Sequence, residues 1–213
     1  MSKVNQKSDL DVSANISKYI AEYQYSDREM VERGNELMEN FIRTMAEDNS
    51  SATIKSTDKG EPAIVIAEIF KHAKKEVKIY TGSLADIFTN DVSSFTSLNE
   101  FLRSGKSLKI ALANASKPKP IFQDLLSGYI KHSEGRFQVR GANNAFHENM
   151  DDILNERTDF IVDDRNAFSL TVYPESGLRM PLYSLYSFNN EEYSKQLDKA
   201  FSSELFKKCP SLF

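Results

Sequence analysis

The chain has 213 residues, of which 40% are hydrophobic and 27% are charged, and its formal net charge is −4. This length and composition predict one substantial core, and they exclude a wholly disordered chain. No apolar run approaches the ~20 residues needed to cross a bilayer, so we expect no membrane contact. The acidic balance disfavours non-specific binding to nucleic acid.

The cysteine and histidine content excludes two further classes of protein. Cys209 is the single cysteine, so no internal disulfide forms, and the three histidines lie on separate segments without the spacing of a zinc site. Neither a metal nor a cofactor is therefore predicted. The first residues are polar and lack the apolar core of a secretion signal, which predicts a cytoplasmic protein.

Two amphipathic helices are predicted within residues 1–48, which form an N-terminal helical extension. Apolar residues between Val12 and Tyr23 share one helical face, and Ser26 to Glu29 has the S-x-x-E spacing of a capping box that begins the second helix. Such a pair forms an αα-hairpin whose apolar stripe is covered by the main domain or by another copy of the chain. The apolar stripe of the second helix has two interpretations: it packs into the core, or it forms an interface with a second copy or another partner. Its candidate interface residues are Met30, Leu37, Met38, Phe41, Ile42 and Met45.

Residues 49–60 are polar, rich in Ser and Thr, and lack apolar periodicity, so they are predicted to be a linker. The main domain is predicted over residues 61–213, where helices and strands alternate. The helices are expected after Pro62, before Gly105 and after Pro120, and the strands over residues 77–81, 108–112 and 137–140. This order predicts an α/β fold in which a mixed, largely parallel sheet is flanked by helices.

A β-hairpin is predicted over residues 157–173, because two runs of β-branched and aromatic residues flank turn-forming residues from Asp163 to Asn166. It adds an antiparallel element to the sheet. A C-terminal helix follows, which begins at an Asn cap, Asn189 or Asn190, and ends at Pro210.

The hairpin and the elements around it resemble the phospholipase D superfamily over residues 61–206. The family motif is H-x-K-x4-D followed by G-S-x-N, and two such motifs, often from two protomers, meet at one site. There one His attacks phosphorus and the other protonates the leaving group. On this chain Arg157 stands at the His position, Asp159 at the Lys position and Asp164 at the Asp position. Ser187 and Asn189 match the S-x-N element.

The departures from the motif predict that the family's phosphodiesterase activity is absent. A permanently protonated Arg157 cannot replace a nucleophilic imidazole, and Asp159 would repel a phosphate rather than hold it. These two residues are two positions apart on a strand and point to the same face. They could form an ion pair across the cleft that holds the phosphate in the family.

A ligand, if one binds, is expected beyond the carboxyl ends of the parallel strands. The alternative is that the residues at these strand ends only connect each strand to the following loop. Together with the motif positions, this placement gives the candidate ligand-binding residues Thr81, Gly82, Ser83, Asn114, Arg140, Arg157, Asp159, Ser187 and Asn189.

His147 is the candidate for a substitute catalytic His, in a polar loop before the hairpin, and a solvated loop His is the alternative. The pairs Asp151-Asp152 and Asp163-Asp164 could hold Mg²⁺, but turn-forming aspartates explain them equally well, so no metal site is predicted. The chain contains no Gly-rich phosphate-binding motif and no G-x-S-x-G. These absences exclude nucleotide-hydrolase and serine-hydrolase interpretations.

Three functional hypotheses result. The first is a non-catalytic phospholipase D-like scaffold, a homodimer bound to a second protein subunit in a bacterial or phage-related assembly such as an antiviral defence system, a setting inferred by analogy. The second is a nuclease or phosphodiesterase with an active site rearranged around the catalytic candidates His147, Arg157 and Asp164. The third is a nucleic-acid-binding module, which the net charge disfavours unless scattered lysines converge into one patch. Those lysines are Lys71, Lys74, Lys75, Lys106, Lys109, Lys117 and Lys119.

Overall fold

A computed structural model describes residues 29–57, 61–82, 92–114, 127–154, 158–174 and 182–212. The chain divides into two compact units, Met1–Phe41 and Ile42–Phe213. A continuous helix covers residues 29–47, as expected for the second N-terminal helix, and the first expected helix lies outside the described residues. No helix within the described ranges is long and apolar enough to cross a bilayer.

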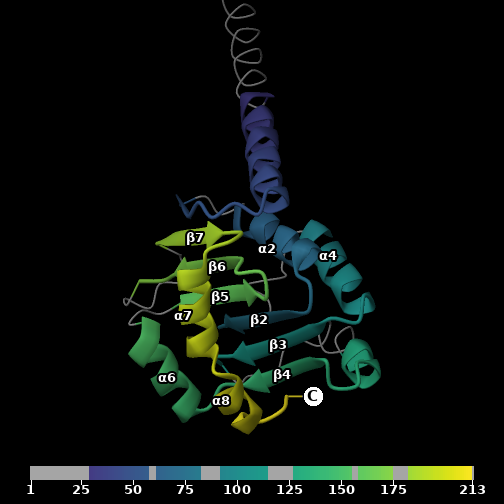
Figure 1. Cartoon of the computed structure of the whole chain (residues 1–213), viewed down its shortest axis with the longest axis vertical. Coiled ribbons are helices and arrows are strands. Elements are labelled where there is room, and N and C mark those ends of the chain that lie inside the picture. Colours follow the sequence, from purple (N-terminus) through teal and green to yellow (C-terminus); the bar gives the residue numbers. More distant parts are fainter. Residues whose placement is uncertain are drawn as a thin grey trace, which may run out of the picture. The chain divides into compact units, whose positions relative to one another are not determined.

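The second unit is built on a seven-stranded mixed sheet flanked by helices, which confirms the predicted α/β class (Figure 1). The strand order is β1-β7-β6-β5-β2-β3-β4. The strands are β1 (Ile54–Ser56), β2 (Glu76–Thr81), β3 (Ser107–Leu112), β4 (Phe137–Gly141), β5 (Thr158–Asp163), β6 (Phe168–Val172) and β7 (Tyr183–Ser187).

The prediction of a largely parallel sheet is wrong. Only the pairings β2-β3 and β3-β4 are parallel, and the other four are antiparallel. The predicted hairpin forms as β5 and β6, and the chain then turns back again into β7, so each new strand reverses direction. Such direct returns give antiparallel pairs, whereas parallel pairs need a crossover.

The segment expected to be a linker, residues 49–60, contributes a strand to the sheet. Ile54 pairs with Tyr186 and Ser56 with Ser184, which makes β1 an edge strand beside β7. This strand has only three residues and no apolar alternation, so its pairing depends on a distant partner rather than on a local pattern.

Helices cover both faces of the sheet. One face packs against α2 (Glu61–His72) and α4 (Val92–Arg103), and the other against α6 (Asn144–Leu154), α7 (Glu191–Phe201) and α8 (Ser203–Lys208). Neighbouring residues on a strand point to opposite faces. Accordingly Ile79 joins the core with α2 and α4, and Tyr80 joins the core with α6 and α7.

Two of the candidate interface residues belong to the core of the second unit. Ile42 is 0% exposed and Met45 is 6% exposed, and both pack in the cluster that contains α2 and α4. Their expected place in a dimer interface is thereby corrected, because this end of the helix is held inside the same molecule. The remaining candidates are exposed by 38% to 68% of their surface, namely Met30, Leu37, Met38 and Phe41.

Candidate functional site

A cluster of polar groups lies where β2 ends and β5 begins. Tyr80 pairs with Phe160, so Thr81 stands opposite Asp159 in the antiparallel register. The Asp159 carboxylate accepts hydrogen bonds from the Thr81 hydroxyl (3.2 Å) and the Gly82 backbone N–H (2.9 Å). It also accepts one from the Tyr173 hydroxyl (3.0 Å). One carboxylate therefore ties together the ends of three strands.

The neighbouring parallel strand adds a further polar group to this cluster. The Asn114 side-chain amide, just past β3, donates to the Gly82 carbonyl over 3.4 Å. The structure therefore brings together Thr81, Gly82, Asn114 and Asp159 at the carboxyl ends of the parallel strands, where a ligand was expected. Whether they bind a ligand stays a prediction. Ser83 and Arg157 lie outside the described residues, and so does the expected Arg157–Asp159 ion pair.

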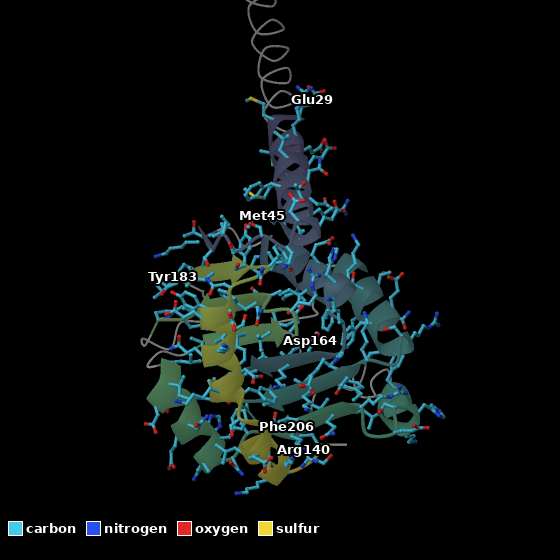
Figure 2. The ribbon with its side chains drawn as sticks, viewed as in Figure 1. Glu29, Met45, Arg140, Asp164, Tyr183 and Phe206 are labelled. Atoms are coloured by element: carbon cyan, nitrogen blue, oxygen red, sulfur yellow. The ribbon has the colours of Figure 1, made fainter. Side chains whose placement is uncertain are left out.

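Arg140 is the penultimate residue of the parallel strand β4, but it contacts the C-terminal segment instead of this cluster. Its Nη1 donates to the carbonyl oxygens of Lys207 (3.0 Å) and Cys209 (2.8 Å). Its guanidinium lies 5.4 Å from the centre of the Phe206 ring, and Figure 2 shows the two side chains next to each other. Arg140 thus fixes α8 and the chain end against β4.

The motif residues Asp164, Ser187 and Asn189 lie at the opposite end of the sheet from Asp159. Asp164 follows Asp159 by five residues along an extended strand, a separation of about 16 Å. Its Oδ1 accepts from the backbone N–H groups of residues 74, 75 and 76. The Ser187 hydroxyl donates to the Ser50 carbonyl (3.4 Å) and accepts from the Asn189 N–H (3.4 Å). These contacts hold loops in place.

His147 lies in α6, not in the loop that the sequence suggested. The Asn143 carboxamide accepts from the Phe146 N–H (3.0 Å) and so begins this helix just before His147. The His147 Nδ1 is 3.2 Å from the Tyr80 hydroxyl. Because Tyr80 and Thr81 point to opposite faces, His147 and Asp159 lie on opposite faces of the sheet.

The catalytic candidates are not gathered into one site. Asp164 contacts the first residues of β2, and His147 contacts Tyr80, which is about 13 Å further along that strand. The third candidate, Arg157, is outside the described residues. His147 and Asp164 therefore lie apart in the sheet, and an active site rearranged around His147, Arg157 and Asp164 stays a prediction.

Asp163 is a buried acid at the turn between β5 and β6. Its Oδ1 accepts from the N–H groups of Arg165 and Ala167, each over 2.8 Å. Its Oδ2 is buried and has no hydrogen-bond partner among the described residues. Burial raises the pKa of Asp163 to about 6. This arrangement serves the turn, and no group of three or more His, Cys, Asp or Glu within the described ranges could hold a metal ion.

The comparison with solved structures defines the fold class. The chain is similar to Nuc from Salmonella typhimurium, a phospholipase D family member, with 10% identity and a TM-score of 0.50, over 75% of this chain and 97% of that one. It is also similar to TrmBL2, an archaeal chromatin protein whose structure shows a novel mode of DNA binding, with 14% identity and a TM-score of 0.51, over 92% of this chain and 70% of that one. The fold is therefore phospholipase D-like.

A third solved structure, phosphatidylserine synthase from Haemophilus influenzae Rd KW20, has 13% identity and a TM-score of 0.44, over 75% of this chain and 39% of that one. No protein-family model matches the sequence. No curated protein matches it either.

Two features at the ends of the sheet were missed in the sequence. The first is the hydrogen bond that Tyr173 donates to Asp159, two residues that the predicted hairpin already contained in its two strands. The second is Arg136, which forms a row at the other end of the sheet with Lys75 and Lys106, two lysines that the third hypothesis named. These three cations immediately precede three adjacent parallel strands. The strand starts were predicted, so their common edge could have been found from the parallel order.

Proposed function

We propose that the protein is a non-catalytic phospholipase D-like domain that works as a self-associating scaffold or interaction subunit. The observation that carries this proposal is the Asp159 carboxylate, which stands at the position of the motif lysine and accepts from three donors. Phosphoryl transfer needs cations and donors directed at phosphate oxygens. Here a carboxylate uses the donors of Thr81, Gly82 and Tyr173, and its own charge repels phosphate.

A turnover assay tests the absence of catalysis. Purified protein is incubated with bis(p-nitrophenyl) phosphate and with DNA, beside the variants His147→Ala and Asp159→Asn. We expect release of product at the rate of buffer alone for all three proteins. Turnover by the wild type that is lost in His147→Ala would replace the scaffold with the nuclease or phosphodiesterase alternative.

Self-association is supported by the helix over residues 29–47. Leu37 is 68% exposed and Phe41 is 47% exposed, and they continue a row of apolar residues that recur in steps of three and four. This spacing forms a seam that two helices of the same kind bury against each other. We assign a second copy of the chain to this stripe, which makes the protein a homodimer.

A second protein subunit is the further partner that we propose. By analogy with other degenerate domains of this kind, that subunit belongs to a bacterial or phage-related assembly, including a defence assembly. Co-purification from the native host, followed by mass spectrometry, identifies the partner. Recovery of the chain at native abundance without any co-purifying protein would contradict a second subunit.

Nucleic-acid binding is the second candidate function. Five of the lysines that this hypothesis required lie around the starts of β2 and β3, and the other two, Lys117 and Lys119, are outside the described residues. TrmBL2, with which the chain shares its fold, is described as showing a novel mode of DNA binding. Retention of the purified chain on immobilised DNA, released by added salt, tests this candidate. The five described lysines are Lys71, Lys74, Lys75, Lys106 and Lys109.

A further inference from the structure

We infer that nucleic acid binds at one end of the sheet, where the strands β2, β3 and β4 begin. The surface there is formed by Lys74, Lys75, Lys106 and Arg136, and we call it the basic edge. This inference rests on the second candidate function and gives it a surface. The basic edge lies at the amino ends of β2, β3 and β4, opposite the end that carries Asp159. Figure 1 shows these three strands running in the same direction, so their first residues share one edge.

Backbone hydrogen bonds place the cations of the basic edge side by side. The Ser107 N–H donates to the Lys75 carbonyl, and the Leu108 N–H donates to the Arg136 carbonyl, each over 2.8 Å. Adjacent strands are about 4.8 Å apart, so the three strand starts form a row. A row of cations across three strands fits an extended polyanion better than a single phosphate.

The backbone that carries these cations is held by side chains. Asp164 Oδ1 accepts from the N–H groups of Lys74 and Lys75, each over 3.0 Å, and fixes the loop before β2. The Arg136 guanidinium donates from Nε to the Ser133 carbonyl and from Nη1 to the Gly105 carbonyl, each over 3.0 Å. The cations are thus presented in a fixed order before a partner arrives, which lowers the entropic cost of binding.

The charge of the basic edge is not neutralised by the described residues around it. Nearby lysines are in ion pairs: Lys71 with Glu68, and Lys109 with Glu76. By contrast, no ion pair forms between the four cations of the basic edge and any described acid, and Lys74, Lys75 and Arg136 are exposed.

Three acids lie close to the basic edge, and one of them, Glu76, is in ion pairs with Lys78 and Lys109. Glu134 precedes Arg136 on the surface, and Asp164 accepts from backbone N–H groups. Four cations against the two acids outside these ion pairs, Glu134 and Asp164, give a local excess of positive charge on a chain whose net charge is −4. Such an excess on an acidic protein indicates a surface for phosphate groups, because the rest of the chain repels them.

Fluorescence anisotropy with a short DNA duplex and a single-stranded RNA of equal length tests the basic edge. The test variant is Lys74→Gln, Lys75→Gln and Lys106→Gln together. The matched control, Lys199→Gln, Lys207→Gln and Lys208→Gln, changes the net charge equally on α7 and α8. Glutamine is a polar side chain one atom shorter than lysine and carries no charge, and circular dichroism verifies that both variants fold.

We expect the wild type to bind at low salt and the test variant to bind about tenfold or more weakly, with its log K against log salt slope reduced by about 2 to 3. The control should stay within about twofold of the wild type, since its lysines lie outside the row. Binding that both variants weaken equally, or that neither weakens, overturns the basic edge but leaves nucleic-acid binding in place. No binding by the wild type at low salt overturns both.

Discussion

The carboxylate of Asp164 accepts a hydrogen bond from the backbone N–H of Lys75 over 3.0 Å, and 89 residues of chain separate the two. The same oxygen accepts from the N–H groups of Lys74 (3.0 Å) and Glu76 (3.4 Å). Asp164 therefore joins the turn after β5 to the loop before β2, and Figure 2 shows it at that end of the sheet.

Replacing Asp164 with Ala should lower the free energy of unfolding by about 1–2 kcal/mol, as the loss of a helix-capping side chain does. Asp164→Asn keeps an acceptor and should lose less. Urea unfolding followed by circular dichroism measures both. The control is Asp152→Ala, an exposed acid on α6, which should change stability by less than about 0.5 kcal/mol. Equal losses in Asp152→Ala and Asp164→Ala would show that the three hydrogen bonds contribute nothing.

The buried Asp163 should make stability depend on pH. Burial raises its folded pKa from 3.8 to about 6, so the fold favours the protonated acid. The stabilisation of the fold by protonated Asp163 is complete below pH 3.8 and is lost as the pH rises through 6. Folding with the ionised carboxylate costs about 3 kcal/mol. Asp163→Asn removes that ionisation. The free energy of unfolding of the variant, relative to that of the wild type, should be about 1–1.5 kcal/mol higher at pH 8 than at pH 5.

Urea midpoints at pH 5 and pH 8 provide the measurement for Asp163→Asn. Any fixed cost of the new amide appears at both pH values and cancels in the difference. Asp152→Asn is the matched control, because it removes an exposed acid on α6 and should show no comparable gain. A stability difference from the wild type that is the same at both pH values contradicts the raised pKa.

Sequence patterns predicted the elements whose pairing is local. The hairpin of β5 and β6 forms as expected, because its strands and its Asp163–Asn166 turn are contiguous in the chain. The alternation of helix and strand up to residue 141 likewise gives the parallel strands β2, β3 and β4. Pairing between distant segments was not predictable in this way, and β1 shows why. Its three residues pair with β7, more than a hundred residues away.

The candidate site residues lie at two ends of the sheet for a related reason. Asp159 and Asp164 belong to one sequence motif, yet a strand carries them to opposite ends of the sheet. Ser187 ends β7, which runs in the same direction as β5, so it lies at the end with Asp164. Only the direction of each strand decides which end a residue reaches. The expectation of a largely parallel sheet is wrong for β5, which pairs antiparallel with β2.

The Tyr173–Asp159 hydrogen bond should appear as an energetic coupling between β5 and the end of β6. Tyr173→Phe and Asp159→Ala, combined in a double-mutant cycle, should give an interaction energy of about 0.5–1.5 kcal/mol in urea unfolding. The reference cycle pairs Tyr173→Phe with Asp164→Ala at the opposite end of the sheet. That pair should be additive within about 0.5 kcal/mol. Equal coupling in the two cycles would mean that the 3.0 Å contact has no specific energetic role.

Charges placed on the exposed stripe of the helix over residues 29–47 should prevent dimer formation. Leu37→Asp combined with Phe41→Asp puts two carboxylates into the seam, where burial without a partner is costly. Asn35→Asp with Asn40→Asp adds the same charge to the same helix away from the apolar row. Light scattering should give a monomer mass for the first variant, and a dimer mass for the second and for the wild type. Because Leu37 and Phe41 are exposed within the single chain, their replacement should leave the circular dichroism spectrum unchanged. A wild type that stays monomeric at high concentration, or a seam variant that keeps the dimer mass, removes this stripe as the dimer interface.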